Sequence, residues 1–373
     1  MRRSTHMTAC SSLVIASLGL LACGGNHATD GGTDGAPVDS AGGPDAIITT
    51  PPDGPPLVGA KHTLTYPTTA VTPGEENTKC VWIRLDNDAP IKVHQLHNVL
   101  SNQSHHLIVY RDDQDTTEQL TPVACRPFSG ALNASGRIAP FMITQKKDDP
   151  LTLPTGVAYT LAAHQMIKLE MHYLNSTEMP QDAGATVDLY EAEDAAAITD
   201  EADILFIGTP DINLAAGETK SVHEFFTLPG SANLGTPQIF AITGHTHQYG
   251  TSVKVATADG PTSTATQVYG PPSFLWSEPE TTTHSPAFTI PTGGGFDFEC
   301  DYHNTSNQAV GFGESANDEM CFFWAYYYPS RGSRVCVHTA QAGGPTGLNV
   351  CCPVPDTAPA SDKQLCAYLA QTF

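Results

Sequence analysis

Residues 167–173 read Ile-Lys-Leu-Glu-Met-His-Tyr, one of several short strand-like runs that decide the fold class of this chain. Turn-forming residues separate it from similar runs at 80–85 (CVWIRL), 107–110 (LIVY), 251–255 (TSVKV) and 322–327 (FFWAYY). The composition is rich in Thr, Val, Tyr, Gly and Pro, and long helical runs of Ala, Leu, Glu and Lys are scarce. Short strands at this spacing favour antiparallel β-sandwiches over βαβ units.

The length of 373 residues allows two domains of ordinary size. The acidic stretch 191–201 (EAEDAAAITDE) lacks a strand pattern, so we place a domain boundary there. We expect an all-β protein with two tandem antiparallel, jelly-roll-like sandwich domains at 57–195 and 196–334. The tail 335–373 has few strand signals and holds half of the cysteines expected in disulfides, which predicts a small stapled appendage.

The N-terminus has the features of an export signal. These are a positive start (Arg2, Arg3), a short apolar stretch (12–22) and the lipoprotein-like processing site Leu20-Leu21-Ala22-Cys23. We expect residues 1–22 to be removed and Cys23 to carry a lipid, and Gly24 favours the outer membrane of a bacterial envelope. The alternative is an ordinary secretory signal in which Cys23 is incidental. No later run approaches about 18 apolar residues, so we expect a lipid anchor alone.

Two further features restrict the setting of the folded part. Residues 24–56 consist mostly of Gly, Asp, Pro, Ala and Thr, too polar to offset chain entropy, so 23–56 is expected to be a disordered tether. The net charge of -22 would repel phosphates, which excludes nucleic acid as a partner. Export to an oxidising compartment also predicts disulfides among the remaining cysteines.

Histidine pairs are the sharpest local motifs. In His245-Thr246-His247, residues i and i+2 of a strand point to one face, so both imidazoles can meet one metal ion. His105 and His106 are adjacent, so joint ligation needs a bulge, a twist or a strand end. Taken singly, such histidines are more often surface or hydrogen-bonded residues, and Met320 is more often core filling.

Four segments together resemble the copper type II, ascorbate-dependent monooxygenases, the family that includes peptidylglycine alpha-hydroxylating monooxygenase and dopamine beta-monooxygenase. They occur in the order 104–110 (SHHLIVY), 169–173 (LEMHY), 244–247 (GHTH) and 317–327 (NDEMCFFWAYY). The resembling portion runs from about Lys61 to Arg334. The resemblance implies two β-sandwich domains whose metal sites face each other across a solvent-filled cleft.

The resemblance also implies two copper ions per chain. His105, His106 and His172 would form an electron-transfer site, and His245, His247 and Met320 the catalytic site that binds O2. Imidazole suits both oxidation states of copper, and a thioether favours Cu(I), whereas a zinc hydrolase has no use for Met. The implied reaction is hydroxylation of an aliphatic or benzylic C–H bond of a small substrate, with O2 and a one-electron reductant such as ascorbate.

The family's disulfides map onto two cysteine pairs here, Cys80–Cys125 around the His-His pair and Cys300–Cys321 ending next to Met320. The four tail cysteines have no clear counterparts. We expect them to pair among themselves, with a bond between neighbours least favoured and a zinc site as a weaker alternative; they are Cys336, Cys351, Cys352 and Cys366.

The chain departs from the family at the expected substrate contacts. Thr243, Phe322 and Trp324 stand where peptide-amidating members carry Arg, Asn and Tyr, so no cationic clamp remains for a carboxylate. We therefore expect a neutral, apolar or aromatic substrate, unless both rings are core residues. Glu170 replaces a Gln and could bind water or a substrate amine, unless it is an ordinary strand residue.

Two other functions compete with the monooxygenase. One is a non-catalytic copper-binding lipoprotein that retains the fold, and the other is an exported structural or adhesion β-sandwich. The presence of all six expected ligands favours the monooxygenase, because a binding module could lose one site without penalty.

Overall fold

The computed structural model describes residues 58–128, 137–341 and 347–372. The chain divides into two compact units, 1–51 and 52–373, and only the second contains described residues. The expected signal peptide, the lipid on Cys23 and the tether 23–56 all lie outside the described residues. Within the described residues, no helix combines the length and apolar character needed to cross a bilayer.

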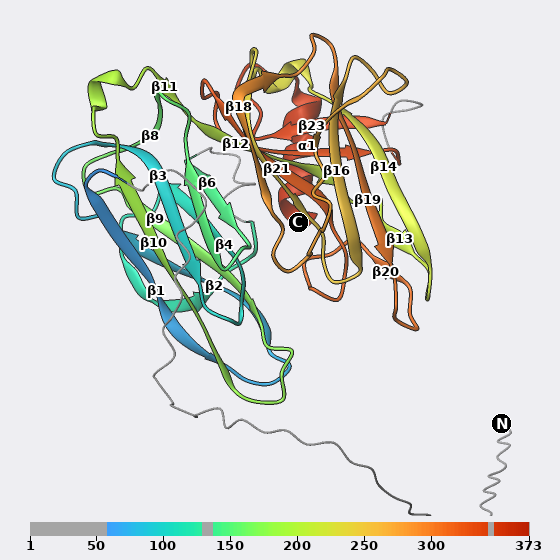
Figure 1. Ribbon diagram of the computed structural model, residues 1–373, viewed down its shortest axis with the longest axis horizontal. Helices are drawn as coiled ribbons and strands as arrows, with labels where there is room; N and C mark the ends of the chain where they lie inside the picture. Colours follow the sequence, from blue (N-terminus) through green and yellow to red (C-terminus); the bar gives the residue numbers. More distant parts are fainter. Residues whose placement is uncertain (1–57, 129–136, 342–346, 373) are drawn as a thin grey trace, which may run out of the picture. The chain divides into compact units, whose positions relative to one another are not determined.

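Two sheets make up the N-terminal sandwich (Figure 1). One has the strand order β1-β10-β3-β8-β11 with β7 beside β3, and the other has the order β5-β2-β9-β4-β6. The strands are β1 (Lys61–Val71), β2 (Glu76–Arg84), β3 (Ile91–Leu100), β4 (Ser104–Asp112), β5 (Gln119–Ala124), β6 (Ile138–Thr144), β7 (Asp148–Thr152), β8 (Val157–Leu161), β9 (Met166–Leu174), β10 (Gln181–Glu191) and β11 (Asp200–Glu201). A 3-10 turn, η1 (Ala195–Ala197), precedes β11.

The C-terminal sandwich is built from the rest of the chain. Its sheets have the orders β18-β15-β21-β12-β22-β23 and β14-β19-β16-β17, with a small β13-β20 pair. The elements are β12 (Asp203–Thr209), β13 (Asn213–Leu214), β14 (Thr219–Thr227), η2 (Gly230–Ala232), β15 (Gln238–His245), β16 (Gly250–Ala258), β17 (Thr266–Tyr269), β18 (Thr281–Thr289), β19 (Gly295–His303), β20 (Val310–Gly311), β21 (Cys321–Tyr328), β22 (Arg334–Thr339), β23 (Leu348–Cys352) and α1 (Ala360–Thr372). The predicted all-β sandwich fold is confirmed.

The chain passes from the N-terminal sandwich to the C-terminal one across a single residue. Glu201 ends β11, which pairs with β8 of the N-terminal sandwich, and Asp203 begins β12, which pairs with β21 of the C-terminal one. Only Ala202 lies between them. The boundary that we placed at 195/196 stays a prediction, since 52–373 forms one compact unit.

The four tail cysteines pair among themselves, as expected, but the tail also contains two strands that were not predicted. Strand β22 adds in parallel to β12, and β23 then pairs with β22, so both extend the main C-terminal sheet. Disulfides Cys336–Cys351 and Cys352–Cys366 join β22 to β23 and β23 to α1. The valines at 335, 337 and 350 are nearly fully buried. The parallel pairing of β22 with β12, more than a hundred residues away, leaves no local signal in the sequence, which is why this extension of the sheet was missed.

The disulfides implied by the family resemblance are both present. Cys80–Cys125 joins β2 to the segment after β5, and Cys300–Cys321 joins β19 to β21. The second bond therefore links the two sheets of the C-terminal sandwich directly after Met320.

Strand β9 is buried on both faces. Its apolar face, with Leu169 and Met171, lies in the sandwich core, and its polar face carries Lys168, Glu170 and His172 at 0–4% exposure. Lys168 and Glu170 form an ion pair of 2.9 Å. Burying two charges costs desolvation energy, which their attraction and further hydrogen bonds must offset. The polar face of β9 is therefore an interior surface and is not exposed to solvent.

Strand β21 also has two buried faces. Phe323 and Tyr327 belong to the core of their own sandwich, while Phe322, Trp324 and Tyr326 alternate onto the opposite face and join the core cluster of the N-terminal half. The Tyr326 hydroxyl lies 3.1 Å from the carbonyl oxygen of Ile143 in β6. Apolar and polar contacts therefore join the two sandwiches next to the histidine motifs.

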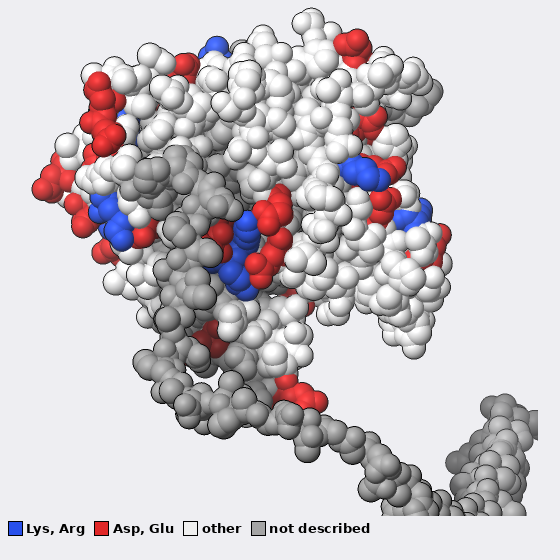
Figure 2. Space-filling view, in the orientation of Figure 1, with Lys and Arg blue, Asp and Glu red and all other residues white. Residues whose placement is uncertain are grey.

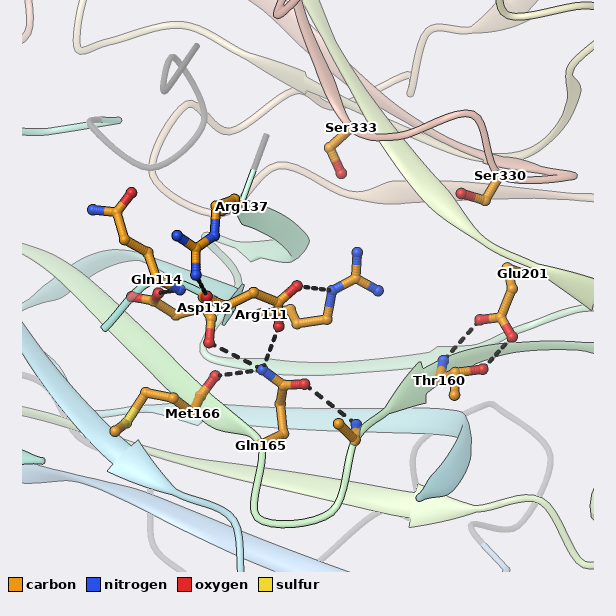
Figure 3. Close-up of polar contacts among 12 residues, drawn as sticks. Arg111, Asp112, Gln114, Arg137, Thr160, Gln165, Met166, Glu201, Ser330 and Ser333 are labelled. Atoms are coloured by element: carbon orange, nitrogen blue, oxygen red, sulfur yellow. Dashed lines mark hydrogen bonds and ion pairs between the residues drawn. The ribbon is translucent and has the colours of Figure 1, made fainter. Parts of the chain in front are cut away.

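Polar side chains also fasten the strand ends away from the histidines (Figure 3). The Gln165 amide donates to the Asp112 carbonyl (3.0 Å) and to Oδ1 of Asp113 (2.9 Å).

On the face in Figure 2, the few Lys and Arg side chains adjoin acidic ones, and most of the surface is uncharged. That face offers no basic patch for a polyanion, in agreement with the net charge of -22.

Candidate metal centre

Strands β4 and β9 bring three imidazoles together. One ring nitrogen from each of His105, His106 and His172 lies within 4.8 Å of the others, and all three side chains are buried. The ladder shifts register between Ser104 and His106, so that His106 stands opposite His172. This irregularity is what lets two adjacent histidines serve one site, as the sequence required.

The His-x-His pair lies at the end of β15. The rings of His245 and His247 are 5.2 Å apart, and their residues are 2% and 1% exposed. The Glu319 carboxylate accepts the backbone N–H of His247 at 2.9 Å and of Tyr249 at 2.7 Å. Glu319 thus braces the turn that presents both imidazoles.

Met320 follows Glu319 directly and precedes the disulfide cysteine. It is 2% exposed and belongs to the same apolar cluster as Phe322 and Trp324. Its carbonyl accepts a hydrogen bond of 2.6 Å from the Tyr302 hydroxyl. The backbone of the third expected ligand is therefore fixed by neighbours in β19 and by the Glu319 turn.

The two histidine groups touch each other. Ring centroids of His106 and His245 are 6.1 Å apart, and those of His105 and His247 are 6.3 Å apart. The family resemblance implies a solvent-filled cleft between the groups, but here five imidazoles form one buried cluster with 1–7% exposure. The structure therefore shows the two groups closed against each other.

Two acceptors outside the cluster orient its rings. Glu76 Oε1 lies 2.9 Å from Nε2 of His172, and its Oε2 accepts the Ser315 hydroxyl at 2.8 Å. Gln145 Oε1 lies 2.9 Å from Nδ1 of His245. Carboxylates and amides of this kind fix the tautomer and direction of metal-binding histidines.

The electrostatics of the cluster favour neutral imidazoles. Burial lowers the pKa of His105, His106 and His245 far below its ordinary value, and neighbouring imidazoles lower it further. Burial likewise lowers the pKa of His247 to about 4. Neutral rings keep a lone pair on one nitrogen, which is the form that binds a metal ion.

The free ring nitrogens test whether a metal fits. Among the described residues, Nδ1 and Nε2 of His106 and Nε2 of His245 are buried and have no hydrogen-bond partner. Leaving such atoms unsatisfied is costly, and a bound cation would use their lone pairs. Imidazole ligands suit copper in particular, and a thioether such as that of Met320 would be a further suitable ligand.

The expected substrate residues are all buried near the cluster. Phe322 and Trp324 are 1% and 2% exposed, and Phe206 stacks on Phe322 with centroids 4.8 Å apart. The Thr243 hydroxyl is hydrogen-bonded to that of Thr281 at 2.8 Å. Glu170 is not an ordinary exposed strand residue, because it is fully buried and paired with Lys168. Their roles toward a substrate stay predictions.

Several residues around the site were not foreseen. Gln145 and Glu76 come from distant segments with no motif around them, and Trp276, whose ring lies 5.4 Å from that of His105, comes from the loop before β18. Glu319 had a signal, because it stands inside the Asp-Glu-Met-Cys segment. The others become visible only when the sandwiches meet.

Fold and site together define an all-β protein with a buried cluster of five histidines. Residues 202–343 match the sequence model of the copper type II ascorbate-dependent monooxygenase, C-terminal domain. The match covers this part of the chain, and there it confirms the resemblance to the copper- and ascorbate-dependent family seen in the sequence.

Other comparisons add little. No curated protein matches the chain. The major capsid protein P2 of bacteriophage PM2 aligns with 73% of this chain and 100% of its own, at 9% identity and a TM-score of 0.32. PNGase F, a glycosylasparaginase from Flavobacterium meningosepticum, aligns with 73% of this chain and 97% of its own, at 10% identity and a TM-score of 0.31. Similarities this weak carry no information on function.

Proposed function

We propose that this protein is a copper-dependent monooxygenase that hydroxylates an aliphatic or benzylic C–H bond of a small organic substrate. It would hold two copper ions and use O2 with a one-electron reductant such as ascorbate. The observation that carries the proposal is the cluster of five buried imidazoles with unsatisfied ring nitrogens, joined to a domain of this family.

The residues divide into two ligand sets. His105, His106 and His172 are the proposed electron-transfer ligands, since an all-imidazole set suits both oxidation states of copper. His245, His247 and Met320 are the proposed ligands of the oxygen-binding site, where the soft thioether favours Cu(I). Copper, when bound, supplies the chemistry that activates O2 and breaks the C–H bond.

The residues around these ligands exclude water and fix the orientation of the segments that carry the ligands. Phe206, Phe322 and Trp324 form an apolar wall beside His245, whose ring centroid is 6.0 Å from that of Trp324. Such a wall raises the strength of every electrostatic contact within it. Glu319 and Glu76 hold the ligand-bearing segments through hydrogen bonds.

The same wall supports a neutral, apolar or aromatic substrate. Lys168 at 2.9 Å neutralises the Glu170 carboxylate, which weakens the case for a substrate amine there. Thr243 offers a hydroxyl and no positive charge for a carboxylate. A panel in which only glycine-extended peptides were hydroxylated would contradict this assignment.

Metal analysis and oxygen uptake test the proposal together. The protein freed of its first 56 residues should bind two copper ions per chain and consume O2 with ascorbate in the presence of a suitable substrate. Copper binding with no turnover over a broad panel would favour the alternative, a non-catalytic copper-binding lipoprotein. Failure to bind copper at all would leave only a structural or adhesion role.

The anchoring of the chain is a separate proposal. We propose that Cys23 carries the lipid that attaches the protein to the bacterial envelope, on the strength of the processing site Leu20-Leu21-Ala22-Cys23. Wild-type protein should partition with membranes and incorporate labelled fatty acid. Cys23→Ser should be found in the soluble fraction, and unchanged membrane association of that variant would refute the anchor.

A further inference from the structure

Gln145 occupies a position between the two histidine groups. It directly follows β6 in the N-terminal sandwich and is 2% exposed. Its Oε1 lies 2.9 Å from Nδ1 of His245, in the C-terminal sandwich, and its Nε2 lies 3.4 Å from Nε2 of His105. One neutral side chain therefore contacts both proposed copper sites.

The hydrogen-bond partners determine how the Gln145 amide is oriented. Its Nε2 donates to the backbone carbonyl of Trp276, and a carbonyl oxygen can only accept. The amide oxygen must then face His245, where it can only accept. Nδ1 of His245 therefore carries the proton.

The consequence for His245 concerns its other nitrogen. A neutral imidazole with the proton on Nδ1 has its lone pair on Nε2. In the described part of the chain, Nε2 of His245 is buried and has no partner. The atom left free by Gln145 is thus the one available to a metal ion.

We infer that Gln145 is a positioning residue that holds His245 in the tautomer whose Nε2 is free for copper. This inference rests on the proposed function. Because Gln145 and His245 come from different sandwiches, the tautomer depends on the two sandwiches being in contact. The longer contact to His105 places the same amide against the electron-transfer group.

The first test needs no metal. In protein labelled with 15N-histidine, the imidazole nitrogen shifts of metal-free wild type should show His245 protonated at Nδ1, with the signal assigned by its loss in His245→Asn. Gln145→Leu should convert it to the other tautomer or to a mixture. Gln145→Glu keeps an acceptor at the same place and should restore the wild-type pattern.

Gln165→Leu is the matched control. Gln165 is also buried, and its amide nitrogen donates to Asp112, Asp113 and Met166 (Figure 3) rather than to an imidazole. It should leave the His245 shifts unchanged, even if it lowers stability. Wild-type His245 protonated at Nε2 would overturn the inference without reference to any variant.

The second test uses copper. Outer hydrogen-bond partners of ligating histidines are worth about 10–100-fold in metal affinity. Gln145→Leu should weaken copper at the His245 site by about that factor and alter its electron paramagnetic resonance spectrum. The site with His105, which Gln145 meets only at 3.4 Å, should lose less affinity. Equal affinity and an unchanged spectrum would overturn the inference.

The two failures are distinguishable. If wild-type protein binds no copper, the proposed function fails, while the metal-free tautomer comparison still decides the role of Gln145 toward His245. If wild type binds two ions and the Gln145 variants match it in both tests, the inference alone fails.

Discussion

Glu76 joins His172 to the opposite sandwich: one carboxylate oxygen lies 2.9 Å from Nε2 of the imidazole, and the same oxygen accepts the backbone N–H of Ala316 at 2.7 Å. Burial raises the pKa of Glu76, but hydrogen bonds from His172, Ala316 and Ser315 outweigh it and lower the pKa to about 2. The carboxylate is therefore charged at neutral pH and engages the Nε2 side of the ring, so Nδ1 would be the nitrogen left for the proposed copper ion.

Replacing Glu76 should weaken the electron-transfer site selectively. We expect Glu76→Ala to lower copper affinity at the His105, His106 and His172 group by about 10–100-fold, because the ring loses its acceptor. Copper competition titrations measure this. Glu75→Ala is the control, since Glu75 bonds Tyr173 and Thr72 but no imidazole; an equal loss in both variants would contradict the assignment.

The substitution Met320→Leu distinguishes the proposed role of the sulfur as a copper ligand from the role of the side chain in packing. Leucine keeps similar volume in the apolar cluster, so the cost in folding free energy should be below about 1.5 kcal/mol. The variant should lose the copper–sulfur signal in X-ray absorption of the reduced protein and should lose turnover, while the three-imidazole group still binds copper. Retained turnover in this variant would exclude Met320 as a ligand.

Glu319 should act through the backbone. Burial raises its pKa to about 7, although N–H groups of His247, Tyr249 and Met320 lower it. Glu319→Ala removes the acceptor from several buried donors, which costs about 1–3 kcal/mol for each unsatisfied group. Chemical denaturation should show the loss. Copper affinity at the His245 site should fall, with the other site spared; uniform loss at both sites would indicate general unfolding.

The raised pKa of Asp149 should make the folding stability of the protein depend on pH. Burial raises its pKa to about 6, although the Thr144 hydroxyl bonds it. The folded state therefore holds this proton more tightly than the unfolded state, and stability is lost as pH rises from about 4 through about 6. The loss is about 3 kcal/mol at most.

Asp149→Asn has no proton to lose, so its stability relative to wild type should increase between pH 4 and pH 7. Urea unfolding at both pH values, with disulfides intact, measures the difference. A pH-independent difference between the two proteins would show that Asp149 ionises normally in the folded state.

Much of this architecture was predictable from the sequence because strands and ligand motifs are local patterns. The short runs predicted the sandwiches, and the family resemblance implied the Cys300–Cys321 disulfide beside Met320 that the structure contains. Contacts between segments far apart left no such pattern. Gln145 and Trp276 meet only because β6 and the loop before β18 lie together, and the parallel pairing of β22 with β12 has no local signature either.

The close approach of the two histidine groups could not be predicted from the sequence either. Ligand identity predicts which rings gather, but the 6.1 Å between His106 and His245 depends on how two sandwich surfaces pack. One of those surfaces includes Phe322, Trp324 and Tyr326, which alternate along β21 and join the core cluster of the N-terminal half. The alternation of side chains along a strand shows which residues share a face, but it does not show which part of the protein covers each face.

The single-residue passage at Ala202 has a mechanical consequence. One residue spans only about 3.3–3.6 Å, so the last residue of β11 and the first of β12 stay tethered at nearly constant separation. Such a short connection does not let the two halves slide apart at this point. If they separate to admit a substrate, we expect an angular movement about Ala202, largest at the points furthest from it.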